Sequence, residues 1–123
     1  MKRELNVSQV LKSFEGKEIK RDGVSGDVFT LRDGLLGYLR NASGMGLTPH
    51  EENIAYTLGF LVGPAEGKVE LTTEQYDVIK KICDNGKSKN VQGQETNVYS
   101  IEIQYQIKEM VDRSTPKDTK PLS

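Results

Sequence analysis

The side chains that could carry out chemistry are few in this sequence of 123 residues, and they are widely spaced. His50 is the only imidazole and Cys83 is the only thiol. A structural zinc site takes four Cys or His ligands and a catalytic site usually takes three protein ligands, so these two residues cannot supply a zinc site. His50 falls in the first turn of a predicted helix, where we expect an exposed side chain without a catalytic partner. The sequence therefore predicts no metal site and no catalytic residue.

Cys83 belongs to an apolar stripe that repeats at helical spacing with Tyr76, Ile79 and Ile82. A reactive cysteine needs an electropositive and partly exposed setting, because its thiolate is the nucleophile. The stripe predicts the opposite setting. We expect Cys83 to be a small buried side chain of the core.

The segment Gly63-Pro64-Ala65-Glu66-Gly67-Lys68 has only a superficial likeness to a phosphate-binding loop. Its two glycines are one residue too close, and Val69 takes the place of the Ser or Thr that would bind magnesium. A predicted helix comes before this segment and a short extended segment, Val69-Glu70-Leu71, comes after it, which is the reverse of the order around a phosphate-binding loop. We predict a turn here, and no cofactor.

Four carboxylates lie near predicted helix starts and form a candidate acidic site. Glu51 and Glu52 are adjacent in the sequence, and a helix start favours negative charge because of the helix dipole. No spacing argument brings them together with Asp33 or Glu74. We expect these carboxylates to lie on a solvated face.

The densest basic cluster is the only candidate nucleic-acid surface. It consists of Lys80, Lys81, Lys87 and Lys89. No arginine or aromatic residue is interleaved among these lysines, so any binding to nucleic acid would be weak and would fall as the salt concentration rises.

Three segments begin with strong helix-start signals, each with a threonine at the cap position. The apolar residues that follow each threonine repeat at helical spacing, which predicts an amphipathic helix in each case. Gly34 and Gly37 weaken the first helix by about 1 kcal/mol each relative to alanine. The predicted helices span residues 31–42, 49–62 and 73–84, after Thr30, Thr48 and Thr72.

Two other segments fit both a helix and a strand. In residues 5–14 the apolar residues repeat at helical spacing, yet residues 12–19 also resemble a small hairpin, which we favour. In residues 99–107 the apolar residues alternate as in a strand, yet apolar residues continue at helical spacing as far as Val111. We favour a helix there, because Ser100 can cap it.

Two polar segments complete the predicted organisation. Residues 87–97 lack any periodicity and predict a mobile loop. Residues 114–123 contain two prolines and almost nothing to bury, which predicts a disordered tail. We therefore predict an α+β fold that is mainly α. Residues 1–113 form a single domain with a small N-terminal β-hairpin and three to four short helices.

Charge and hydropathy exclude several classes of protein. The 17 basic and 18 acidic residues give a net charge of -1, which disfavours a dedicated nucleic-acid or membrane-surface binder. The N-terminus lacks the apolar core of a signal peptide, and the apolar stretch 54–62 is far shorter than the ~20 residues of a membrane span. A single cysteine allows no internal disulfide, which favours a reducing intracellular setting.

The order of short motifs between residues 12 and 112 resembles small proteins of tailed bacteriophages and prophages, most of them uncharacterised. The motifs are Phe14-Glu15-Gly16-Lys17-Glu18-Ile19, Thr30-Leu31-Arg32-Asp33, Gly46-Leu47-Thr48-Pro49-His50-Glu51-Glu52, Val69-Glu70-Leu71-Thr72-Thr73-Glu74 and Ile79-Lys80-Lys81. The polar segment 87–97 and the triplet Ile101-Glu102-Ile103 depart from the pattern.

The resemblance implies a viral origin and a non-enzymatic accessory or virion-associated role, in the host cytoplasm or in the virion. It carries over no catalytic residues. We predict that the protein acts through contacts with a phage structural protein or a host protein. The alternative is a nucleic-acid-binding regulator of phage or host that uses the four lysines of the basic cluster.

Overall fold

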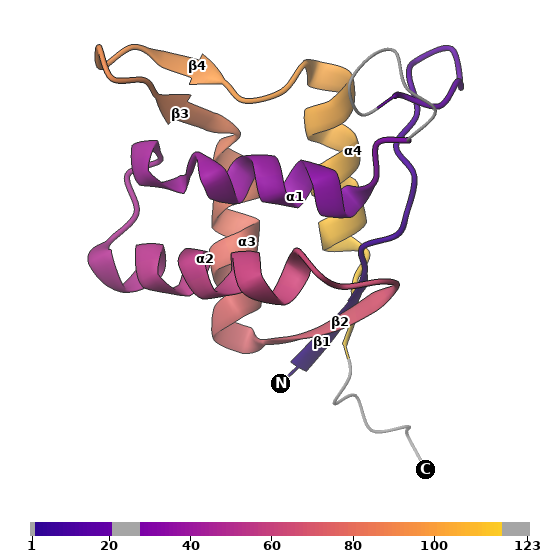
Figure 1. Ribbon diagram of the computed structural model, residues 1–123, viewed down its shortest axis with the longest axis horizontal. Coiled ribbons are helices and arrows are strands. Elements are labelled where there is room, and N and C mark those ends of the chain that lie inside the picture. Colours follow the sequence, from indigo (N-terminus) through magenta and orange to yellow (C-terminus); the bar gives the residue numbers. More distant parts are fainter. Residues whose placement is uncertain (1, 21–27, 117–123) are drawn as a thin grey trace.

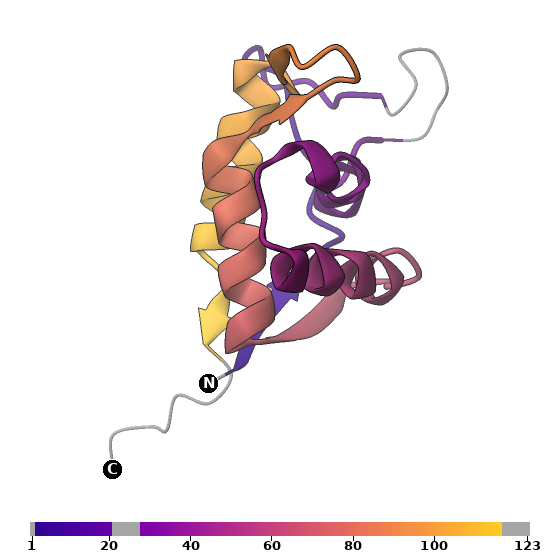
Figure 2. The ribbon, with the colours of Figure 1, turned by 90° about the vertical axis from the view of Figure 1, so that its left-hand side faces the viewer.

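Four α-helices are the largest elements of the described structure, a computed structural model that describes residues 2–20 and 28–116. Figures 1 and 2 show these helices in two layers, with α1 and α2 side by side in one layer and α3 and α4 in the other. A single turn of 3-10 helix, η1 (Ala42–Gly44), follows α1. The helices are α1 (Leu31–Arg40), α2 (Pro49–Val62), α3 (Thr73–Asn85) and α4 (Ile101–Asp112).

The three helix starts predicted from threonine caps are confirmed. In α1, α2 and α3 the threonine hydroxyl accepts a hydrogen bond from a backbone N–H three residues on, and the side chain of that residue accepts from the threonine N–H. These capping boxes satisfy donors that would otherwise lack a partner. The helix after Ser100 is also confirmed, although the Ser100 side chain forms no capping hydrogen bond. Gly86 ends α3 in the left-handed conformation, with φ of 67°.

A three-stranded antiparallel sheet brings distant parts of the chain together, in the order β2-β1-β5. Strand β1 (Lys2–Asn6) pairs with β2 (Lys68–Thr72) in a register that places Glu4 opposite Glu70. The sequence predicted an extended segment at β2 but no strand at β1. Residues 5–14 form no helix, and the favoured hairpin is present as a bridge between Lys12 and Glu18.

The start predicted for the C-terminal tail needs correction. Strand β5 (Thr115–Pro116) pairs with β1, and Ser114 is buried. The Arg3 guanidinium donates a hydrogen bond to the Ser114 carbonyl at 3.1 Å. These three residues therefore belong to the folded domain. The rest of the predicted tail, residues 117–123, lies outside the described residues.

The prediction of a mobile loop over residues 87–97 is wrong, because this segment forms a β-hairpin. Strand β3 (Lys87–Lys89) pairs with β4 (Glu95–Asn97). The buried Ser88 hydroxyl donates to the Asn41 carbonyl at 2.8 Å, which attaches the hairpin to the end of α1. Polar contacts of this kind leave no hydrophobic periodicity in the sequence, so the pattern could not reveal the strands.

The core lies between the two helix layers and extends under the sheet. Its largest fully buried side chain is Tyr38, and Cys83 is 1% exposed, as predicted. In the part of the chain that the structure describes, no helix is long and apolar enough to cross a membrane.

Candidate protein-binding surface

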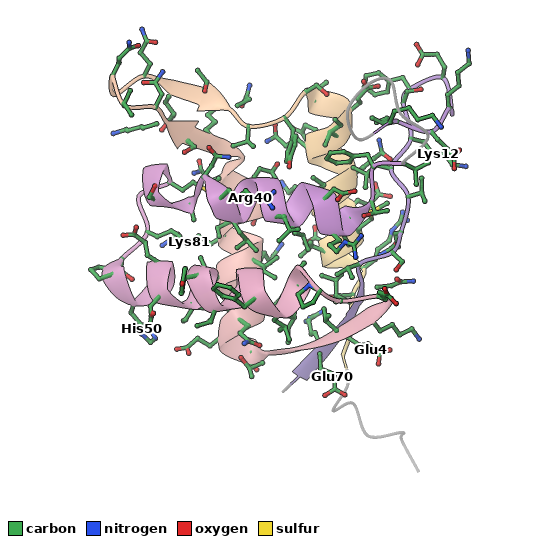
Figure 3. The ribbon with its side chains drawn as sticks, viewed as in Figure 1. Glu4, Lys12, Arg40, His50, Glu70 and Lys81 are labelled. Atoms are coloured by element: carbon green, nitrogen blue, oxygen red, sulfur yellow. The ribbon has the colours of Figure 1, made fainter. Side chains whose placement is uncertain are left out.

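The structure places His50 and the nearby carboxylates in separate, exposed contacts. His50 Nε2 lies 2.9 Å from Glu74 Oε2, with 69% and 63% of the two side chains exposed. Glu51 instead contacts Lys81, whose ammonium lies 2.9 Å from a carboxylate oxygen. These two contacts join the N-terminal end of α2 to α3, and exposed contacts of this kind contribute little stability. Figure 3 shows His50 at that end of α2.

Cys83 lies in a setting that suppresses its reactivity. Burial raises the pKa of its thiol, and the nearby carboxylates of Asp84 and Asp112 raise that pKa further. A thiol held in its neutral form is a poor nucleophile and a poor metal ligand. The described residues contain no group of three or more His, Cys, Asp or Glu side chains that could hold a metal ion.

The four lysines of the basic cluster are not equivalent. Lys80 lies 2.6 Å from Asp112 and 3.6 Å from Asp84, and its hydrogen bond to Asp112 raises its pKa. Lys81 is held by Glu51. Both ammonium groups therefore have carboxylate partners, which compete with phosphate for them. Lys87 and Lys89 lie on the separate β3–β4 hairpin, both exposed.

A hollow of about 680 Å³ lies between η1, α3 and the β3–β4 hairpin. It brings Lys81 and Lys89 to one lining, but Glu51 forms an ion pair with Lys81, and the lining also contains Glu95, which lies opposite Lys89 in the register of the hairpin. The remaining lining mixes apolar and amide side chains. The charges in this hollow are therefore mostly balanced within the chain.

The outer side of α2 presents an exposed pair of aromatic rings. Tyr56 is 68% exposed and Phe60 is 69% exposed. Their positions one helical turn apart place them side by side, with ring centroids 5.0 Å apart and planes at 77°. Leu61, the next residue, is also exposed. A pair of large apolar side chains on the surface indicates an interaction site more strongly than a single one does.

Sequence reasoning missed this pair, although a signal for it was present. The helical spacing of Ile54, Leu58, Leu61 and Val62 predicts one buried face of α2, which left the aromatic residues on the opposite side without an explanation. The prediction is wrong for Leu61, which is exposed, whereas the other three residues are buried. A helix that is apolar all round is normally covered on all sides. In this structure α2 is covered on one side only.

A groove lies beside the aromatic pair, lined by residues of α1 and α2, the two helices that run side by side in Figure 1. We name this surface the α1–α2 face. Its hollow measures about 360 Å³, and Arg40, the last residue of α1, contributes to its lining. Figure 3 shows Arg40 on α1, far from Glu4 and Glu70, which are carboxylates of strands β1 and β2. The lining residues are Leu36, Leu39, Arg40, Ala55, Tyr56, Gly59 and Phe60.

A second exposed apolar group lies where the N-terminal hairpin meets α4. Phe14 is 79% exposed and lies near Ile101 and Tyr105 around a hollow of about 450 Å³. The Gln106 amide accepts a hydrogen bond from the Lys12 N–H at 2.9 Å and donates one to the Lys12 carbonyl. These contacts hold the hairpin against α4 through polar groups of both segments.

Comparisons with known proteins give no relative. No protein-family model matches the sequence, and searches of curated proteins and of solved structures find no match. The likeness to phage and prophage proteins therefore stays a prediction. The function has to be argued from the surface of this chain.

Proposed function

We propose that this protein is a non-enzymatic binding module that holds a partner protein on its α1–α2 face. The observation that carries the proposal is the exposed pair of Tyr56 and Phe60 beside the groove. Aromatic residues are enriched at the centres of protein interfaces, where a few anchors supply most of the binding energy.

The exposed apolar surface can supply a substantial part of the free energy of association. Two aromatic side chains that are each two-thirds exposed present roughly 250 Å² of apolar surface. Removing that area from water would contribute about 6 kcal/mol before the entropic costs of association are subtracted. The groove adds contact area from Leu36 and Leu39, which are only partly buried in the free chain.

The motif order that resembles phage proteins supplies the biological setting of the proposal. In that setting the partner is a phage structural protein or a host protein, and the module acts in virion assembly or on the host. The ion pairs of Lys80 and Lys81 favour this proposal over nucleic-acid binding, because they occupy two of the four lysines on which the alternative depends.

Site-specific photo-crosslinking tests the proposal. A photoreactive phenylalanine analogue is placed at Phe60, and in a matched control at Val91, an apolar residue that is fully exposed at the tip of the β3–β4 hairpin. The chain is expressed in bacterial cells, the host class that the phage resemblance implies, during infection by a tailed phage, so that host proteins and phage structural proteins are both present. We expect a discrete cross-linked product from position 60 that is absent from position 91.

The captured protein is then purified, and its affinity is measured for three chains: the wild type, the Phe60→Ser variant and the Val91→Ser variant. We expect Phe60→Ser to weaken binding by about 30-fold or more, as loss of an interface anchor does, and Val91→Ser to leave the affinity unchanged. The proposal is overturned if position 60 yields no product, if both positions yield the same products, or if Phe60→Ser binds as well as the wild-type chain.

A further inference from the structure

The charges around the α1–α2 face are unevenly shared between the two helices. On α1, the spacing of Arg32, Leu36 and Arg40 places all three on one side of the helix. Arg32 donates to the Ala65 carbonyl at 2.9 Å, and Arg40 is exposed at the opposite end of α1. Neither guanidinium forms an ion pair with a described residue. On α2, Glu52 lies one turn before Tyr56 and is the acidic residue on that side.

From this arrangement we infer that the α1–α2 face binds an amphipathic helix of the partner, with carboxylates beside its apolar stripe. The inference rests on the proposed function and adds the chemistry of the partner. The groove between two neighbouring helices suits the docking of a third helix along it. An added Cβ at Gly59 would meet nothing within 4 Å, so the floor of the groove has room for an incoming side chain.

A carboxylate of the docked helix would lie at the Arg40 end of the groove. An arginine pairs well with a carboxylate because its planar guanidinium can donate two parallel hydrogen bonds. Unlike Lys80 and Lys81, Arg40 has no ion-pair partner to displace among the residues that the structure describes. Complementary charge at the rim of an interface acts mainly on specificity, so Arg40 selects the partner while Tyr56 and Phe60 supply most of the affinity.

A second copy of this chain fits the face less well than a single helix does. Stable interfaces between globular proteins bury about 800 Å² on each partner. The two exposed rings present roughly a third of that area, which suits the apolar stripe of one helix. A second copy would also have to bring one of its carboxylates to Arg40. Glu52, the acidic residue on this side of α2, lies at the same end of the groove as the Arg40 of its own copy.

A selection from a displayed peptide library tests the partner chemistry. The library holds 18-residue amphipathic helices with a fixed apolar stripe and with Glu, Gln or Lys in equal proportion at the flanking positions. It is selected against the wild-type chain, Arg40→Glu and Phe60→Ser. Thermal unfolding followed by circular dichroism checks that each variant is folded. The affinities of the recovered helices are measured by fluorescence anisotropy at 50 and 300 mM salt.

We expect the wild-type chain to enrich glutamate at the flanking positions and Arg40→Glu to enrich lysine instead. Helices recovered on the wild-type chain should bind Arg40→Glu about tenfold more weakly, and their affinity should fall as salt rises. Phe60→Ser should bind none of them appreciably. Glu52→Gln should tighten the binding of acidic helices, because it removes a like charge near the Arg40 end.

The possible failures separate this inference from the proposed function. If the recovered helices need Phe60 but show no glutamate enrichment, the partner chemistry is wrong and the binding face stands. If the helices bind Phe60→Ser with the affinity that they have for the wild-type chain, both the inferred partner chemistry and the proposed binding face are wrong. The inference is also overturned if no helix is recovered, or if sedimentation shows a wild-type dimer that Phe60→Ser abolishes, because a second copy then occupies the face.

Discussion

Tyr99 places its hydroxyl against Gly37, at a point of α1 where no larger residue fits. An ideal Cβ built on Gly37 would lie 1.8 Å from Tyr99 Oη, and the same hydroxyl donates to the Gly34 carbonyl at 2.9 Å. Gly34 in turn faces the Ile107 side chain of α4. The two glycines that weaken α1 as an isolated helix therefore allow the two helix layers to approach each other.

Replacing Gly37 by alanine should destabilise the protein, although alanine is the better helix former. The gain in helix propensity is about 1 kcal/mol, whereas overpacking a filled site costs about 1–3 kcal/mol, and Tyr99 would also lose its hydrogen bond. Gly59→Ala is the matched control, because the added methyl group meets open space on α2 and should stabilise the protein. Urea unfolding measures both changes, and a Gly37→Ala variant more stable than the wild type would contradict the packing described.

The two tyrosines in contact at this site should respond to loss of the hydroxyl in opposite directions. The Tyr38 hydroxyl is buried and has no hydrogen-bond partner among the described residues, whereas Tyr99 donates to Gly34. Leaving a buried polar group unpaired costs about 1–3 kcal/mol, so Tyr38→Phe should raise the free energy of unfolding. Tyr99→Phe should lower it by about 1 kcal/mol. Equal effects of the two substitutions in urea unfolding would argue against this difference.

Cys83 should react with a thiol reagent only when the protein opens. Burial raises its pKa, and its side chain is 1% exposed in the folded chain. Labelling at pH 8 should be at least about a hundredfold slower in buffer than in 6 M urea. A native labelling rate close to that of free cysteine would show that the thiol lies in an accessible setting.

The contact between Glu51 and Lys81 should make stability depend on pH in the acid range. Hydrogen bonds from Lys81 and from the Thr48 backbone lower the pKa of Glu51 below its ordinary value. A carboxyl group whose folded pKa is lowered stabilises the folded state above the unfolded pKa, and this contribution is lost as the pH falls through the folded pKa. The free energy of unfolding should therefore drop below about pH 4. Glu51→Gln should show a shallower drop, and an unchanged slope would exclude the contact as its source.

The helices could be predicted because their signals are local. Thr30, Thr48 and Thr72 each lie three residues before the backbone donor that they cap, and the apolar stripes repeat within one helix. Such signals require no knowledge of the rest of the chain. The helix after Ser100 was favoured from a Ser100 cap and from its apolar spacing. The helix is present, but the expected cap is not, because the serine side chain forms no capping hydrogen bond.

The missed features depend on residues that are far apart in the sequence. Strand β1 forms because Lys2–Asn6 meets Lys68–Thr72, and no local pattern reveals that pairing. The β3–β4 hairpin is attached through Ser88 and the Asn41 carbonyl, a contact between polar groups. The α1–α2 face was missed for another reason, because one buried stripe seemed to explain α2 while Tyr56 and Phe60 lay on its other side.

The most direct test of the binding face is hydroxyl-radical footprinting of the aromatic side chains, with the chain free and bound to the partner captured at position 60. Tyr56 and Phe60 report on the α1–α2 face, and Phe14 and Tyr105 are internal controls that are about as exposed in the free chain. We expect oxidation of Tyr56 and Phe60 to fall severalfold on binding while Phe14 and Tyr105 stay unchanged. Unaltered oxidation of Tyr56 and Phe60, or protection of Phe14 and Tyr105 in their place, would contradict the account.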